Sequence, residues 1–173
     1  ALDNFCNSHN AVVYVNHLSN YSGTYSIQAN MLVSCGGFSK LKPELLITIG
    51  GQTGDYSIYG ALKNLNGVEH WRVAEDGAFV DTYGKLTKIF ECPDYFFFEK
   101  MAANTNSTHS YYEEWSTLND TINYDIELPL SNLYVAQQMY QKVPKNSIMN
   151  FAILNSLRCW SYFPLDPSIQ GYG

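Results

Sequence analysis

Three glycines follow directly on an apolar run, a pattern that can bring a ligand against the main chain. The run covers residues 45–49, Leu-Leu-Ile-Thr-Ile, and is followed by Gly50, Gly51 and Gly54. A continuous apolar run is typical of a strand covered on both faces, and glycines at its carboxyl end let a ligand approach the backbone. The N–H groups that open the next helix suit a phosphate. We therefore treat these glycines as a candidate ligand edge.

Two residues in the same segment argue against a nucleotide phosphate. Gln52 stands where the dinucleotide motif G-x-G-x-x-G requires its second glycine, and Asp55 would repel an anion. We interpret the glycines mainly as turn and packing residues, and nucleotide binding stays open as the alternative.

A polar loop, residues 16–23, follows the β-branched run 11–15, which we interpret as the first strand. In parallel α/β sheets the carboxyl edge carries ligands, so His17 and Asn20 are the binding candidates of this loop. The alternative is that both side chains are only solvated.

Polar side chains also follow the last apolar run, residues 147–154. Asn155 and Ser156 come at its carboxyl end, and Arg158 lies two residues further on. Amide, hydroxyl and guanidinium groups at such an edge can orient an anionic substrate. The alternative is structural: Ser156 caps a helix, Asn155 satisfies turn backbone and Arg158 is solvated.

No catalytic or metal-ligating residues are predicted. The sequence contains no G-x-S-x-G elbow, no P-loop and no H-E-x-x-H motif. Its cysteines are widely spaced, without a C-x-x-C pair, and are predicted to be free thiols: Cys6, Cys35, Cys92 and Cys159.

Composition excludes several classes of partner. With 173 residues, a net charge of −6 and 10 scattered Lys and Arg residues, the chain suits one domain that binds neither nucleic acid nor an anionic membrane. No apolar run approaches the length of a membrane span, which predicts a cytoplasmic protein. The 14 Tyr, 9 Phe and 3 Trp residues predict that some aromatic side chains lie at an interface.

The alternation of apolar patterns predicts an α/β fold. We expect a three-layer, Rossmann-like, doubly wound and mainly parallel sheet of five to six strands, the architecture of NAD- and FAD-binding domains. The predicted strands are 11–15, 44–49, 69–74, 86–92 and 147–154. The predicted helices are 2–10, 25–35, 56–65, 95–103 capped by Asp94, 111–118 anchored by Trp115, and 133–143 capped by Ser131. Residues 164–173, rich in Pro and Gly, read as an irregular linker.

Several motifs resemble a known family. They are Leu45-Leu-Ile-Thr-Ile-Gly-Gly, Glu69-His-Trp-Arg-Val, Asp81-Thr-Tyr-Gly-Lys-Leu-Thr and Ile153-Leu-Asn-Ser. Together they are similar to the central region of the thiamine-diphosphate-dependent synthases of menaquinone biosynthesis. Those enzymes make succinyl-enolpyruvyl-hydroxycyclohexene carboxylate from 2-oxoglutarate and isochorismate. The resemblance is most specific at His70-Trp71, Asp81-Thr82 and Asn155-Ser156.

The resemblance implies that residues 1–163 are the central domain of a larger enzyme and residues 164–173 a linker. Its partners would be a pyrimidine-binding domain and a pyrophosphate-binding domain of the same chain, in a parent that is a homo-oligomer. Thiamine diphosphate and Mg²⁺ would be held by those other domains, so that this part binds no cofactor and is inactive alone. The parent would decarboxylate a 2-oxo acid and join the remainder to an acceptor.

The resemblance also implies substrate contacts at Asn155 and Ser156. The family has an arginine four residues after this serine that helps bind substrate carboxylates, and here that position is Trp160. Arg158 stands two residues earlier, which changes the direction in which its guanidinium group would point. The parent would then use another acceptor or belong to a sister group. Two rival functions remain: a stand-alone NAD- or FAD-binding module, and an inert interdomain scaffold.

Overall fold

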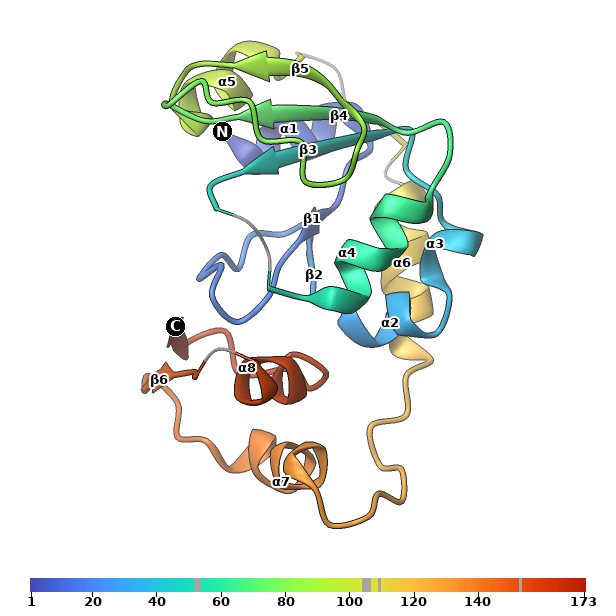
Figure 1. The fold of residues 1–173 in the computed structure, drawn as a ribbon, viewed down its shortest axis with the longest axis vertical. Coiled ribbons are helices and arrows are strands. Elements are labelled where there is room, and N and C mark those ends of the chain that lie inside the picture. Colours follow the sequence, from blue (N-terminus) through green and yellow to red (C-terminus); the bar gives the residue numbers. More distant parts are fainter. Residues whose placement is uncertain (52–53, 104–106, 109, 153) are drawn as a thin grey trace.

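The computed structural model describes residues 1–51, 54–103, 107–108, 110–152 and 154–173. They form a mixed α/β structure (Figure 1). The helices are α1 (Leu2–His9), α2 (Asn30–Ser34), α3 (Gly37–Lys40), α4 (Tyr56–Asn64), α5 (Asp94–Met101), α6 (Ser110–Asp120), α7 (Asn132–Met139), the 3₁₀ turn η1 (Tyr140–Lys142) and α8 (Asn155–Trp160).

The described strands form three separate parallel ladders. The first joins β1 (Val13–Tyr14) to β2 (Ser26–Ile27), the second has the order β3 (Leu45–Ile49), β4 (Glu69–Val73), β5 (Leu86–Phe90), and the third joins β6 (Ile148–Asn150) to β7 (Gln170–Tyr172). The α/β class and the parallel pairing agree with the sequence analysis. A single sheet of five to six strands is not formed among these residues.

The predicted helix 25–35 is wrong over its first half. Ser26 and Ile27 form β2, and only Asn30–Ser34 is helical. Val13 donates its N–H to Tyr25 O at 2.8 Å, and Val15 donates to Ile27 O at 3.0 Å. These long-range bonds to β1 override the helical spacing of the local sequence, which is only a weak preference.

The carboxyl-terminal end also differs from the expectation. Within the segment 164–173, predicted to be irregular, Gln170–Tyr172 forms a strand beside β6. Strand β6 is shorter than the predicted run 147–154 and is not buried, since Ile148 is 64% exposed. Proline explains the irregular first half of the segment, but the last residues can still accept a parallel partner.

The other predicted elements are close to those observed. Strands β3, β4 and β5 and helices α1, α4, α6 and α7 lie within a few residues of their predicted bounds, and Ser131 caps α7 by accepting from Tyr134 N. Asp94 is not the cap of α5: Pro93 takes that position, because its extended backbone leads directly into the helix, and Asp94 is the first helical residue.

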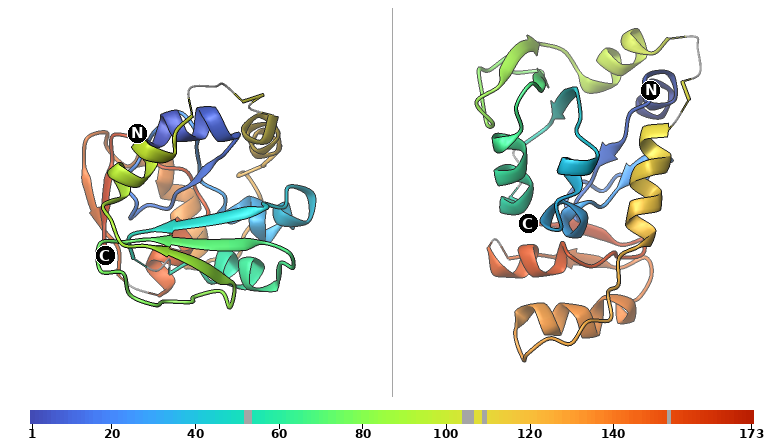
Figure 2. Two further views of the ribbon diagram at one scale, coloured as in Figure 1. Left: turned by 90° about the horizontal axis from the view of Figure 1, so that it is seen from above. Right: turned by 90° about the vertical axis from the view of Figure 1, so that its right-hand side faces the viewer.

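Two apolar clusters hold the larger part of the molecule together. One lies between α2, α4 and α6 around Trp115, which is 2% exposed, and the other joins α1 and α5 to β3–β5 around Phe97 and Val73. Below these clusters, helices α7 and α8 pack on each other (Figure 2). Phe163, which follows α8, is fully buried against Tyr140 of η1. No helix of the described residues is long and apolar enough to cross a membrane.

We expect Trp115→Ala to lower the free energy of unfolding by about 3–5 kcal/mol, because it empties the space between α6 and α2–α3. The indole packs edge-on against Phe38 at 5.6 Å between ring centroids. Chemical denaturation measures the change. Tyr95→Ala, at a ring that is 62% exposed, is the control and should cost less than about 0.5 kcal/mol. Equal losses in the two variants would contradict the assignment of this core.

Candidate functional site

Three segments far apart in the sequence meet beyond the carboxyl ends of β1 and β3. We call the region of residues 14–20, 54–57 and 154–160 the carboxyl edge. A Cβ added to Gly54 would lie 3.7 Å from Leu157, and His17 Nε2 lies 2.8 Å from Trp160 O. In Figure 1, α8 lies below the start of α4. Predicted site residues from separate loops are thus brought together.

A buried carboxylate fixes the geometry of the carboxyl edge. Asp55 is 2% exposed, and its Oδ2 accepts hydrogen bonds from Tyr14 OH at 2.8 Å and Asn16 Nδ2 at 3.0 Å. The buried Asn30 lies beside them and accepts from Ser57 Oγ at 3.2 Å. Burial, and then the charge of Asp55, raise the pKa of Tyr14 well above its usual range, so its hydroxyl stays a donor. This network locks the end of β1 to the start of α4.

The glycines before α4 leave open space at this edge. Gly50 has φ +69°, a conformation that favours glycine, and a Cβ on Gly50 or Gly51 would meet nothing within 4 Å. Gln52, which breaks the dinucleotide motif, lies outside the described residues. Asp55 stands at the N-cap position of α4, so a phosphate at this helix end would meet a carboxylate.

The polar groups of His17 and Asn20 are used within the chain. The His17 ring stacks on Phe151 at 5.4 Å, and its Nε2–H donates to Trp160 O. Asn20 pairs with the main chain of Gly171, donating to its O at 2.9 Å and accepting from its N at 2.8 Å. Both side chains join the loop after β1 to the carboxyl-terminal segments, and a ligand role for them stays a prediction.

Arg158 stacks on an aromatic ring at the carboxyl edge. Its Cζ lies 3.9 Å from the ring centroid of Tyr56, the first residue of α4. No described residue accepts a hydrogen bond from its guanidinium, and its Nε is buried. A cation stacked on a tyrosine keeps its planar donor fork oriented, which suits a carboxylate. Among the predicted residues, Arg158 is the one whose geometry can do chemistry with an anion.

Asn155 and Ser156 are the first two residues of α8, three and two residues before Arg158. Neither side chain makes a hydrogen bond to a described residue, and the N-cap position belongs to Leu154, which has φ +82°. The capping role considered for Ser156 is therefore not the arrangement found. Ile153, which opens this family motif, lies outside the described residues.

The other motif residues of the resemblance serve the framework. His70 is 1% exposed, with Nε2 2.9 Å from Thr48 Oγ1 and its ring against Tyr83. Asp81 accepts from the N–H groups of Lys85 and Leu86 and so shapes the turn that leads into β5. These residues stabilise the sheet and do not line the carboxyl edge.

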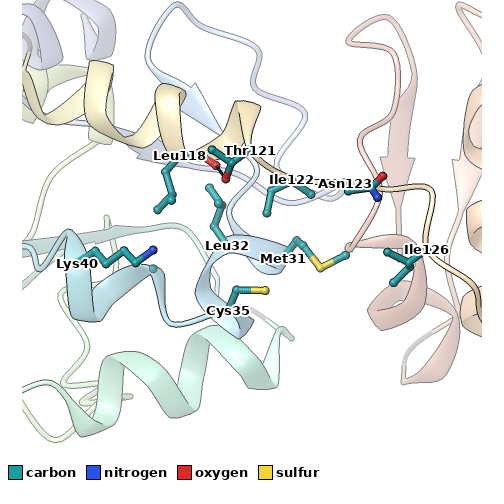
Figure 3. A pocket seen from close by; sticks show the side chains of 10 residues that line it. Met31, Leu32, Cys35, Lys40, Leu118, Thr121, Ile122, Asn123 and Ile126 are labelled. Carbon is teal, nitrogen blue, oxygen red and sulfur yellow. Dashed lines mark hydrogen bonds between the residues drawn. The ribbon is translucent and has the colours of Figure 1, made fainter.

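A hollow of about 370 Å³ lies away from this edge (Figure 3). It is enclosed by α2, α3 and the segment that follows α6, and apolar side chains such as Met31, Leu118 and Ile122 line much of it. None of the predicted site residues lies in it. Among the described residues no group of three His, Cys, Asp or Glu side chains could hold a metal ion, and the four cysteines are free thiols.

The relatives found by comparison with known proteins are enzymes of one class, synthases of a cyclohexene carboxylate. The chain is similar to 2-succinyl-5-enolpyruvyl-6-hydroxy-3-cyclohexene-1-carboxylate synthases. The relative from Phocaeicola vulgatus is 29% identical over 131 residues, which are 75% of this chain and 23% of the relative. That from Flavobacterium psychrophilum is 29% identical over 139 residues (77% and 25%), and that from Christiangramia forsetii 31% over 141 residues (78% and 24%).

This similarity confirms the resemblance that the motifs indicate. The chain spans about a quarter of the length of these curated relatives. No family model matches the chain.

Stability should fall on mild acidification because two histidines are buried in neutral form. Burial lowers the pKa of His17 and of His70 below the ordinary 6.5. Between the lowered pKa values and about 6.5 the unfolded chain binds more protons than the folded chain, so the free energy of unfolding rises with pH in that window. The contribution of the two neutral histidines is fully present above the window and is lost as the pH falls through it.

Denaturant unfolding at a series of pH values between about 7.5 and about 5 measures this loss. His17→Gln and His70→Gln should each remove part of the pH dependence, and the double variant should remove more. A profile that is the same in the wild type and the double variant would contradict the assignment.

Proposed function

We propose that this chain is the central domain of a three-domain thiamine-diphosphate-dependent synthase that decarboxylates a 2-oxo acid and joins the remainder to an acceptor. The proposal rests on similarity over about three quarters of the chain to 2-succinyl-5-enolpyruvyl-6-hydroxy-3-cyclohexene-1-carboxylate synthases. The chain spans about a quarter of their length. The pyrimidine-binding and pyrophosphate-binding domains would then lie in the remaining length of a homo-oligomeric parent.

The arrangement of the strands supports a central domain of this kind. In Figure 1, β5, β4 and β3 lie above the β1–β2 pair, and β6 lies lower still. Each ladder among the described residues is parallel. Val13 of β1 and Ile47 of β3 pack against the same buried cluster. We infer that the three ladders are parts of one doubly wound sheet in the assembled protein, with β1 next to β3.

The residues that the structure describes do not fit the cofactor. A diphosphate with its metal ion needs carboxylate ligands and free N–H groups at a turn, whereas Asp55 is turned inward to Tyr14 and Asn16. The proposal therefore places thiamine diphosphate and Mg²⁺ on the other domains, and no chemical step is assigned to this chain. Its contribution would be to bind substrate.

Substrate binding is assigned to the carboxyl edge. Arg158 would hold a substrate carboxylate with two parallel N–H bonds while Tyr56 keeps the fork oriented, and Asn155 and Ser156 would supply further polar contacts. A charge-assisted bond of this kind contributes about 1.5–3 kcal/mol. Because Trp160 stands in place of the family's arginine, Arg158 would be the cation that binds the substrate carboxylate.

The proposal is tested in the complete synthase that it implies. We expect Arg158→Ala to raise the KM for the acidic substrate by about tenfold or more, because a charge-assisted bond of about 1.5–3 kcal/mol is lost. Arg158→Lys should recover the binding only in part, since lysine cannot pair bidentately. Lys142→Ala removes an exposed cation elsewhere and serves as the control. An unchanged KM in a folded Arg158→Ala enzyme would remove this residue from the site.

The rival nucleotide module makes a different prediction for the present chain. Because Asp55 occupies the start of α4, we expect titration calorimetry with NAD or FAD to show no saturable binding. Thiamine diphosphate with Mg²⁺ should also show none. Saturable binding of NAD or FAD at micromolar concentration would favour the nucleotide module over the central domain. An unchanged KM in the Arg158→Ala synthase, together with no nucleotide binding, would favour the scaffold.

A further inference from the structure

We propose that Asn66 is a site of covalent modification, the spontaneous deamidation of Asn66 through a succinimide with Gly67. Asn66-Gly67 is the one Asn-Gly pair in the sequence. It forms the exposed connection between α4 and β4, after the helix has ended at Asn64. Gly67 has φ +67° and no Cβ to shield its main-chain nitrogen.

The reaction needs only water. A solvent base removes the proton from the Gly67 N–H, and the nitrogen attacks Asn66 Cγ to form a five-membered ring. The bond from Cγ to the side-chain nitrogen breaks, and that nitrogen takes up a proton and leaves as ammonia. Water then opens the succinimide at either carbonyl, which gives aspartate or isoaspartate.

Neither reacting group is held by the fold. No described residue forms a hydrogen bond with the Asn66 carboxamide or with the Gly67 N–H, so both are free to reach the ring geometry. A Cβ added to Gly67 would lie 3.4 Å from Lys42 Nζ, which places an ammonium beside this turn. A nearby cation stabilises the ionised nitrogen and the oxyanion that forms during the attack.

The chain contains a matched pair that should stay intact. Asp76-Gly77 has a glycine with a similar φ of +56°, and the same ring would form there by loss of water. Arg72 holds both Asp76 oxygens, at 2.6 and 3.1 Å, and Gly77 donates its N–H to Ala74 O. These bonds hold the Asp76 carboxylate and the Gly77 N–H in place, so the pair is not free to reach the ring geometry.

Modification would act on the start of β4. Isoaspartate adds one carbon to the main chain just before Val68, which is buried, and Glu69, whose N–H bonds to Glu44 O. The amide-to-carboxylate change also adds a negative charge. This end of β4 is opposite to the carboxyl edge, so substrate binding and deamidation can be measured independently.

The test follows the folded chain in mildly alkaline buffer by peptide mapping with mass spectrometry. We expect Asn66 to convert faster than the exposed Asn123 and Asn132 by at least about tenfold, equivalent to about 1.4 kcal/mol in activation free energy. Isoaspartate should exceed aspartate in the product. Lys42→Gln should slow the conversion, and Asn66→Gln should abolish it.

The Asp76 peptide provides the internal control. It should contain no isoaspartate in the wild type and should gain some in Arg72→Gln. Conversion of Asn66 at the rate of Asn123 and Asn132 would overturn the proposal, and so would an equal rate of isoaspartate formation at Asp76 in the wild type. A change in ligand binding at Arg158 is not expected, so failure here leaves the proposed function untouched.

Discussion

The hydrogen bonds of Asp55 are the constraint on which the carboxyl edge depends. A carboxylate that is 2% exposed needs hydrogen-bond donors, and two of the donors to Asp55 come from the end of β1, 39 and 41 residues away in the sequence. Loss of one partner would leave a buried charge without enough donors, which is far more costly than the loss of an exposed pair. Because the end of β1 and the start of α4 are held together here, Tyr56 can present its ring to Arg158.

The sequence predicted the elements that local pattern determines. The runs 45–49, 69–73 and 86–90 are long enough to show strand character and are bounded by Gly, Pro or turn residues, so they were found. Strands β2 and β7 have two and three residues and exist because of distant partners. No local signal distinguishes such short strands from a helix start or a linker.

The site was predictable to a similar extent. Arg158 and the glycines are predicted because they follow apolar runs, the position at which parallel strands carry ligands. The structure places them at one edge, and their role in binding stays a prediction. The sequence indicates for Asp55 only that it repels anions, because its partner Tyr14 lies on a distant strand. The hydrogen bonds of His17 and Asn20 could not be predicted from the sequence either, because their partners are 143 and 151 residues away. The signal that could have helped is the aspartate directly before a helix.

The two hydrogen bonds between Asn20 and Gly171 affect how the chain folds. The two residues are separated by 151 positions, so their hydrogen bonds close a loop that contains most of the protein. Such contacts form late and slow the search for the native structure, because loop closure costs entropy before the contact is gained. During synthesis the loop after β1 cannot form these bonds until Gly171 has left the ribosome. Until then its polar groups remain open to water or to a chaperone.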